Sequence, residues 1–111
     1  MKFDSRKQGH VTILKLQGEV TGDELSPVRD LLDIQLQEHG CDLVFDLTET
    51  EFVDSKGLEL LLWAQEQANE NLGQVRLVGA NEVVQQVLHM TRLAGRFEAH
   101  PDLEEAMVSL R

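Results

Sequence analysis

Residues 43–63 read LVFDLTETEFVDSKGLELLLW and contain the sharpest change of pattern in the chain. From Leu43 to Leu47 the residues are mostly apolar, aromatic or β-branched, as in a short buried strand. From Leu58 onward the apolar residues recur at helical spacing. The sequence therefore predicts a strand, an acidic loop and a helix, with Ser55 at the junction where the helix begins.

Ser55 is the leading candidate for a functional site. The start of a helix offers unpaired N–H groups and the positive end of the helix dipole, so a phosphate on Ser55 is favoured there. Asp54 and Ser55 are also residue types that cap helices, and capping alone could explain them. If Asp54 is the cap, the third helical position is Gly57; if Ser55 is the cap, it is Leu58. Neither residue is the Glu or Gln that completes a capping box. We interpret Gly57, which costs up to about 1 kcal/mol relative to alanine, as a residue that bares the backbone to another molecule.

Length and composition point to one soluble domain over residues 1–111. The single cysteine, Cys41, has no disulfide partner, and the longest apolar run, Leu60–Ala64, is far shorter than the roughly 20 residues of a membrane span. We therefore expect a cytoplasmic protein without membrane insertion. Twenty acidic and ten basic residues give a net charge of −10, which disfavours nucleic acid as a partner. The charge suits a basic protein surface, or it serves solubility alone.

The first half of the chain predicts a hairpin and a helix. Residues 11–17 alternate apolar and polar side chains, and Phe3 begins a strand that pairs with them across the turn at 7–10. Gly18 is expected to end the second strand. Two overlapping helix starts follow, a capping box at 21–24 and Ser26 with Pro27, and the helix is expected to run to about His39.

The second half predicts a strand at 75–78, a helix capped by Asn81, a short final strand near Phe97 and a closing helix over 102–110. The fold class is therefore α/β: a mixed sheet of four to five strands with an N-terminal antiparallel hairpin, packed with about four helices. The four histidines lie in different segments and lack metal-ligand spacing, and residues 18–22 lack the lysine and hydroxyl of a P-loop. We expect neither a metal nor a cofactor.

Three separated segments resemble the STAS domain of bacterial anti-sigma factor antagonists. They are residues 16–20 (LQGEV), residues 46–47 with 52–58 (DL and FVDSKGL), and residues 83–93, which end in Met90-Thr91-Arg92-Leu93 where the family has Met-Ser/Thr-Gly-Leu. The resemblance spans nearly the whole chain and implies a STAS-like fold. This chain departs from the family pattern at three positions. The family often has a second serine where this chain has Lys56, an aspartate where it has Thr21, and another glycine where it has Glu59.

The resemblance also implies a function without catalysis. In these antagonists the serine that matches Ser55 is phosphorylated by an anti-sigma factor that is also a serine kinase, and the unmodified form binds that factor; a phosphatase is a further possible partner. The predicted partner-binding residues surround this serine or follow it on the same helix: Thr21, Asp23, Asp54, Lys56, Gly57, Leu58 and Trp63. An enzyme is disfavoured because no histidine is identifiable as a base for Ser55.

The alternative function is a constitutive STAS subunit of a signalling or lipid-transport assembly, in which Trp63 matters more than Ser55. On a helical wheel Trp63 falls among Glu59, Glu66, Gln67 and Glu70, so it is predicted to point outward. It is then either an interface anchor or an aromatic ring that lies along its own helix.

Overall fold

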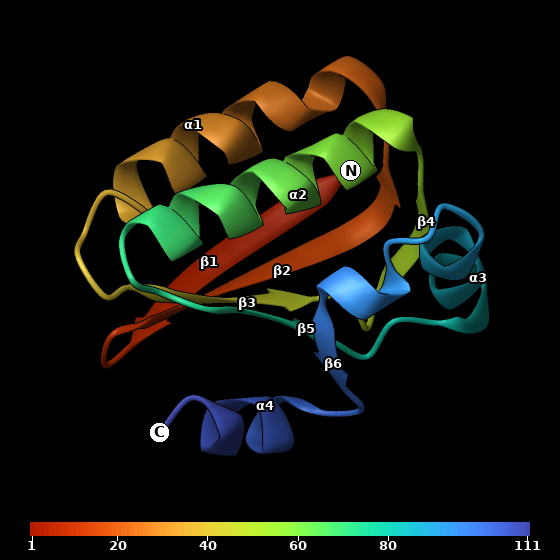
Figure 1. Ribbon diagram of the computed structural model, residues 1–111. Helices are drawn as coiled ribbons and strands as arrows, with labels where there is room; N and C mark the ends of the chain where they lie inside the picture. Colours follow the sequence, from red (N-terminus) through yellow and green to blue (C-terminus); the bar gives the residue numbers. More distant parts are fainter.

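The chain forms one mixed sheet with helices on both faces (Figure 1). The computed structural model describes the backbone of residues 1–111 and all side chains except those of Asp23 and Glu24. The strands and α-helices are β1 (Lys2–Gln8), β2 (Val11–Val20), α1 (Ser26–Gln35), β3 (Asp42–Asp46), β4 (Thr50–Val53), α2 (Ser55–Glu70), β5 (Val75–Val78), α3 (Glu82–Met90), β6 (Glu98–His100) and α4 (Leu103–Ser109). Two 3-10 helices, η1 (Gly22–Leu25) and η2 (Ala94–Arg96), precede α1 and β6. The predicted α/β class is confirmed.

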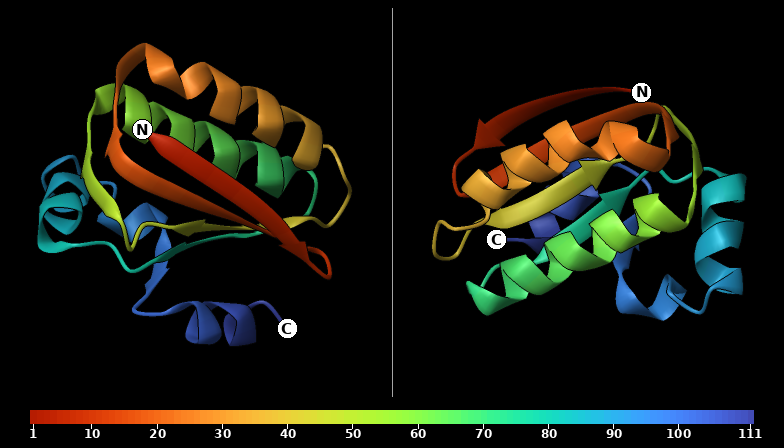
Figure 2. Two further views of the ribbon diagram at one scale, coloured as in Figure 1. Left: turned by 180° about the vertical axis from the view of Figure 1, so that it is seen from behind. Right: turned by 90° about the horizontal axis from the view of Figure 1, so that it is seen from above.

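The sheet has the strand order β1-β2-β3-β5-β6, and β4 pairs separately with the end of β2. β1 and β2 are antiparallel, as predicted, with Phe3 opposite Leu16, and the other pairs are parallel. α1 and α2 lie side by side over one face, and α4 lies against the other (Figures 1 and 2). None of the described helices combines the length and apolar composition needed to cross a membrane.

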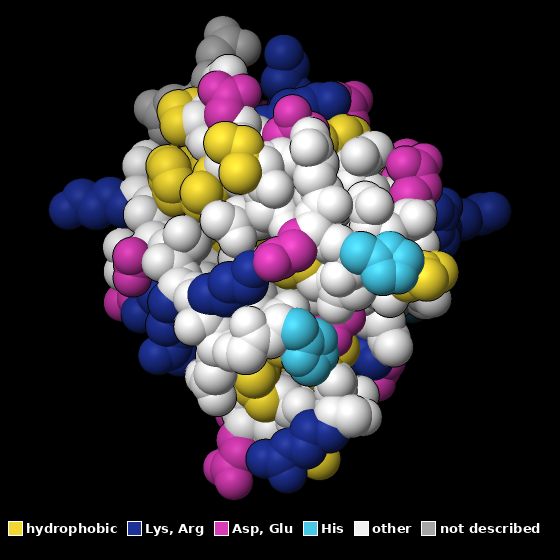
Figure 3. All heavy atoms as spheres, turned by 90° about the vertical axis from the view of Figure 1, so that its left-hand side faces the viewer, with side chains coloured by type: hydrophobic (Ala, Val, Ile, Leu, Met, Phe, Trp, Pro, Cys, Tyr) yellow, Lys and Arg dark blue, Asp and Glu magenta, His cyan; other side chains and the backbone are white. Residues whose placement is uncertain are grey.

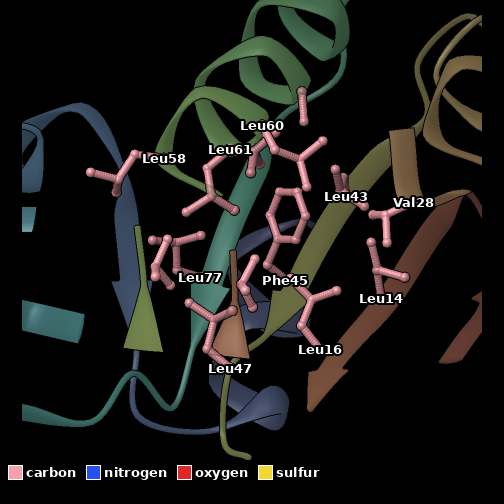
Figure 4. Close-up of a cluster of buried hydrophobic side chains, with 14 of the residues drawn as sticks. Leu14, Leu16, Val28, Leu43, Phe45, Leu47, Leu58, Leu60, Leu61 and Leu77 are labelled. Atoms are coloured by element: carbon pink, nitrogen blue, oxygen red, sulfur yellow. The ribbon is translucent and has the colours of Figure 1, made fainter. Parts of the chain in front are cut away.

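The main core fills the space between the sheet and the α1–α2 layer (Figure 4). Its largest fully buried side chains include Leu14 and Leu16 of β2, Phe45 of β3 and Leu61 of α2. A second, smaller cluster lies under α4 and consists of Val11, Ile13, Val44, Val78, Ala106 and Leu110. β3 contributes to both clusters, which explains its nearly continuous apolar sequence.

β4 brings the number of strands in the sheet to six, and it lies in part of the stretch that we expected to be a loop. The acidic residues around it hide its pattern, in which Thr50 and Val53 are buried while Glu51 and Phe52 are exposed. The Thr50 hydroxyl donates to the Leu16 carbonyl oxygen at 2.7 Å, so this buried polar group is satisfied. The predicted count of four to five strands was therefore too low.

Gly18 does not end β2, contrary to prediction. It has a φ of +91°, and the register between β2 and β4 shifts between Gly18 and Glu19. Such a bulge, at a residue that tolerates positive φ, lets β2 leave β3 and continue beside β4 to Val20. The strand thereby reaches the start of α2.

The first helix differs from prediction at both ends. Thr21 makes no side-chain capping bond, so the expected capping box is not formed from its side. Helix α1 ends at Gln35 rather than about His39, and the Asn71 side-chain amide donates to the Leu36 carbonyl oxygen at 2.8 Å. That bond satisfies one of the carbonyl groups left open where a helix ends.

The turn that follows helix α3 contains a residue other than glycine in the left-handed conformation. Arg92 has a φ of +64°, and the N–H of Leu93 donates back to the Leu88 carbonyl oxygen at 2.8 Å. This arrangement usually places glycine at the left-handed position, because a Cβ there costs about 1–2 kcal/mol. Arg92 occupies the place where the resembling family has glycine.

We predict that Arg92→Gly stabilises the protein by about 0.5–1 kcal/mol, because relief of backbone strain outweighs the entropy that glycine adds to the unfolded chain. The measurement is the free energy of unfolding in urea. Arg92→Ala is the matched control, since it removes the exposed side chain and keeps the strain. Equal stability of the two variants would show that the left-handed conformation costs nothing here.

Candidate functional site

Asp54 joins two segments that are far apart in sequence. It is the N-cap of α2, and its Oδ1 accepts a hydrogen bond from the Gly57 N–H at 2.8 Å. Its other carboxylate oxygen, Oδ2, accepts from the Gly22 N–H at 3.2 Å, at the start of η1. Its own N–H donates to the Val20 carbonyl oxygen at 3.3 Å. The Asp54 carboxylate therefore joins the η1 turn to the first turn of α2, and the Asp54 backbone N–H ties both to the end of β2.

Ser55 is exposed and is the first residue of the 16-residue helix α2. The structure assigns capping to Asp54, so of the two registers left open by the sequence it selects the one in which the Ser55 hydroxyl is not the cap. The helix dipole favours negative charge at this end. The hydroxyl is thus displayed at a helix start without being needed to hold the helix.

Gly57 does not bare the backbone to another molecule, as we had interpreted it. The residue is buried, and a Cβ built on it would lie 2.4 Å from the Val20 carbonyl oxygen and 2.6 Å from Val53 Cγ1. Only glycine lets the first turn of α2 approach the ends of β2 and β4 this closely. Leu58 is also buried, with 7% of its surface exposed. The predicted contact of Gly57 and Leu58 with a partner does not fit these positions.

The accessible surface around Ser55 is mostly acidic. Glu51 and Glu59 are exposed on either side of it, Asp54 is half-buried, and Lys56 is the neighbouring cation. Glu59 lies one helical turn after Ser55 on α2, so a partner that covers the hydroxyl comes close to at least this carboxylate. A basic partner surface suits that arrangement.

Glu49 forms a charged cluster at the base of β4. Its carboxylate accepts from the Lys15 ammonium at 2.6 Å and from the Gln17 amide at 2.8 Å. Hydrogen bonds from Lys15 and then Gln17, together with the Lys15 charge, lower the pKa of Glu49, and the Glu49 carboxylate in turn raises the pKa of Lys15. Glu49, just before β4, is therefore paired with side chains of β2.

The η1 turn lies beside the start of α2. Thr21 is half-buried and immediately precedes Gly22, whose φ of +63° and bond to Asp54 fix the turn. Thr21 is thus brought to the Ser55 junction, as predicted. The side chain of Asp23, the other residue predicted here, lies outside the described residues. Gly22 was missed; the signal was a glycine between a strand end and a helix start.

Trp63 is not the outward-pointing aromatic that the helical wheel predicted. It is half-buried and packs against the main core, and the Arg29 guanidinium carbon lies 4.4 Å from its ring centroid. This cation–π contact joins α1 to α2. A helical wheel cannot reveal it, because Arg29 comes from another helix.

Two of the histidines lie beside carboxylates in separate parts of the fold. His10 Nε2 lies 2.8 Å from a carboxylate oxygen of Asp42, and His100 Nε2 lies 3.4 Å from one of Glu98. Among the side chains that the structure describes, no three or more His, Cys, Asp or Glu residues come together as metal ligands. The described chemistry of the junction is therefore that of a hydroxyl, carboxylates and one ammonium group.

Comparison with known proteins matches residues 2–106 to the family model described as the STAS domain. Protein TM1081 of Thermotoga maritima has a similar structure, with a TM-score of 0.90 and 23% identity over 98% of this chain and 94% of that one. SpoIIAA, an anti-sigma factor antagonist, is similar in its unphosphorylated form, with a TM-score of 0.86 and 18% identity over 99% and 96% of the two chains. The phosphorylated form of SpoIIAA, from Bacillus, has a TM-score of 0.78 and 18% identity over 99% and 100%. No curated protein matches in sequence.

We predict that Gly57→Ala destabilises the protein by about 1–3 kcal/mol, because the added methyl group overlaps the Val20 carbonyl oxygen and Val53. Gly95→Ala is the control, since nothing lies within 4 Å of a Cβ built at Gly95. Urea unfolding of both variants measures the difference. If Gly57→Ala unfolds like Gly95→Ala, the tight contact between α2 and the strand ends is not required.

We also predict that Asp54→Ala lowers the free energy of unfolding by about 1.5–3 kcal/mol, since it removes a helix cap and the bond to Gly22. Asp102→Ala, which removes the single capping bond to the Glu105 N–H on α4, should cost about 1 kcal/mol. Hydrogen exchange supplies the specific readout: the Gly22 amide should lose protection in Asp54→Ala alone. Unchanged Gly22 exchange would contradict the bridging role.

Proposed function

Because the chain belongs to the STAS domain family, we propose that it is an anti-sigma factor antagonist whose binding is switched at Ser55. The unmodified protein binds an anti-sigma factor that is also a serine kinase, and phosphorylation of Ser55 by that kinase opposes binding. The protein itself does no catalysis. The observation that carries this proposal is the exposed Ser55 at the start of α2, with capping performed by Asp54.

Phosphorylation acts on recognition rather than on the fold. A phosphate adds about −1.5 to −2 charges at pH 7. The dipole of α2 tolerates that charge, and none of the bonds made by Asp54 uses the Ser55 hydroxyl. The same charge raises the acidity of a surface that already contains Glu51 and Glu59. A partner group placed to cover a neutral hydroxyl then meets a dianion that is costly to desolvate.

The partner surface at this site is the exposed part of the junction. Ser55 and Lys56 form its centre, Asp54 supplies half-buried carboxylate oxygens, and Thr21 flanks it from the η1 turn. The acidic surroundings favour basic groups on the partner, which also speeds encounter with a chain of net charge −10. A phosphatase would reset the switch, and we expect all these events in the cytoplasm.

The constitutive-subunit alternative loses its main support in the fold. It relied on Trp63 as an exposed anchor, whereas Trp63 packs against the core and under Arg29. A substitution of Trp63 would therefore remove a contact between α1 and α2 within the protein itself. Ser55, in contrast, is exposed at the start of α2, where an added phosphate changes the charge of the surface.

We predict that Ser55→Asp lowers recovery of the anti-sigma partner at least about tenfold, while Ser55→Ala retains it, because a desolvated interface discriminates against the added charge. Tagged variants expressed in the native organism are compared by quantitative mass spectrometry of co-purified proteins. Intact-mass measurement of the protein without substitutions, purified from the native organism, with fragment mapping, should locate phosphate on Ser55.

The control is Gln37→Asp, which adds the same charge at an exposed residue beyond the far end of α1. It should recover the partner as well as the unmodified protein does. Equal recovery by Ser55→Asp and Ser55→Ala would sink the switch. Phosphate absent from Ser55 under all growth and stress conditions would sink the kinase relationship.

A further inference from the structure

β1 is an open edge of the sheet. It pairs with β2 on one side and ends the strand order, and all seven of its residues are exposed. Alternate N–H and C=O groups on its outer side are therefore available to another strand. The other edge, β6, is only three residues long. β1 is thus the edge with the length to support an intermolecular ladder.

The charge on β1 is opposite in sign to that of the chain. The chain has 20 acidic and 10 basic residues, whereas β1 contains Lys2, Arg6 and Lys7 against Asp4. On the side of the molecule that holds the β1–β2 turn, Lys and Arg side chains are interspersed with acidic and histidine side chains (Figure 3). Two copies with a net charge of −10 would repel at most surfaces, and β1 is a place where they can approach without that penalty.

The direction of each β1 side chain follows from its register with β2. Phe3 lies opposite Leu16 and Ser5 opposite Leu14, so the odd-numbered residues share the face covered by α1 and α2. Lys7 also belongs to this face, and its ammonium pairs with Glu38, just beyond the end of α1. Lys2, Asp4, Arg6 and Gln8 share the opposite face, on the side of α4.

This alternation limits how two β1 strands can pair about a two-fold axis. Residues directly opposite each other must point to the same face, so the axis must pass through a residue and not between two residues. An axis at Asp4 puts Asp4 opposite its copy, and an axis at Arg6 puts Arg6 opposite its copy. Both place like charges together and are disfavoured.

An axis at Ser5 gives complementary pairs along the whole strand. Asp4 then lies opposite Arg6 of the second copy, twice by symmetry, Phe3 lies opposite Lys7, and Lys2 lies opposite Gln8. All seven residues take part. Charges on edge strands often prevent pairing, but the order of charges in β1 favours this one long register.

We propose that the protein forms a homodimer through antiparallel β1–β1 pairing centred on Ser5, joining two sheets into one continuous sheet. The same faces meet, so the α1–α2 layers of both copies lie on one side. Phe3, which is 38% exposed, becomes covered on that side. The Ser55 junction follows β4, which pairs with the end of β2 and not with β1, so the proposed strand pairing uses none of the residues of the switch.

The test is sedimentation equilibrium of the chain at about 0.15 M salt, at protein concentrations up to about 0.5 mM. The unmodified protein should be a dimer in reversible exchange with monomer. Asp4→Arg and Arg6→Asp should each raise the dissociation constant at least about tenfold, because each turns two attractive pairs into repulsive ones. The double variant restores opposite charges across the seam and should recover the dimer. Circular dichroism of every variant checks that this exposed strand leaves the fold intact.

Lys2→Asp separates this register from a shorter one centred on Phe3, in which Lys2 lies opposite Asp4 of the second copy. In the Ser5 register Lys2→Asp leaves the dimer in place; loss of the dimer in Lys2→Asp, with Arg6→Asp unaffected, would overturn the proposal. A monomer at every concentration would overturn it as well. A dimer whose dissociation constant is unchanged by both Asp4→Arg and Arg6→Asp would also overturn it.

Discussion

The carboxylate of Asp54 is the interaction on which the functional end of this structure depends. The main core holds the last residue of the turn before α1, where Leu25 is buried, but it does not set the position of the first, Gly22. Asp54 sets it by using both oxygens at once, one for Gly57 and one for Gly22, and such charge-assisted bonds to backbone N–H groups are short and directional. The turn before α1 is thereby held against the start of α2.

Gly57 provides the second half of the same constraint. Its missing side chain lets α2 begin against the Val20 carbonyl oxygen and Val53, which brings the Asp54 carboxylate within reach of the η1 turn. A bulge at Gly18 delivers β2 to this point. Two glycines and one aspartate thus determine the geometry of the junction: the Asp54 carboxylate binds backbone N–H groups, and the two glycines let the backbone bend or approach closely.

The elements with regular patterns were predictable from the sequence. β5 has the predicted bounds, Asn81 and Asp102 cap the helices that follow them, and Ser55 lies at the strand-to-helix junction. The failures concern interactions between segments distant in sequence. β4 is hidden because its pairing with β2 leaves two of its residues exposed, and Trp63 is covered by Arg29 from another helix. Gly57 was misread because its crowding comes from Val20 and Val53, which only the folded chain places around it.

This division between backbone and side chain explains how the fold can persist while its surface changes. The contacts that fix the junction involve amide and carbonyl groups of Gly22, Gly57 and Val20, whatever side chains stand beside them. Lys56 and Glu59 point to solvent from the same turn and can vary without cost to those contacts. A TM-score of 0.90 at 23% identity is what such a small set of constraints permits. The side chains at Lys56 and Glu59 can therefore change while the backbone of the junction keeps its geometry.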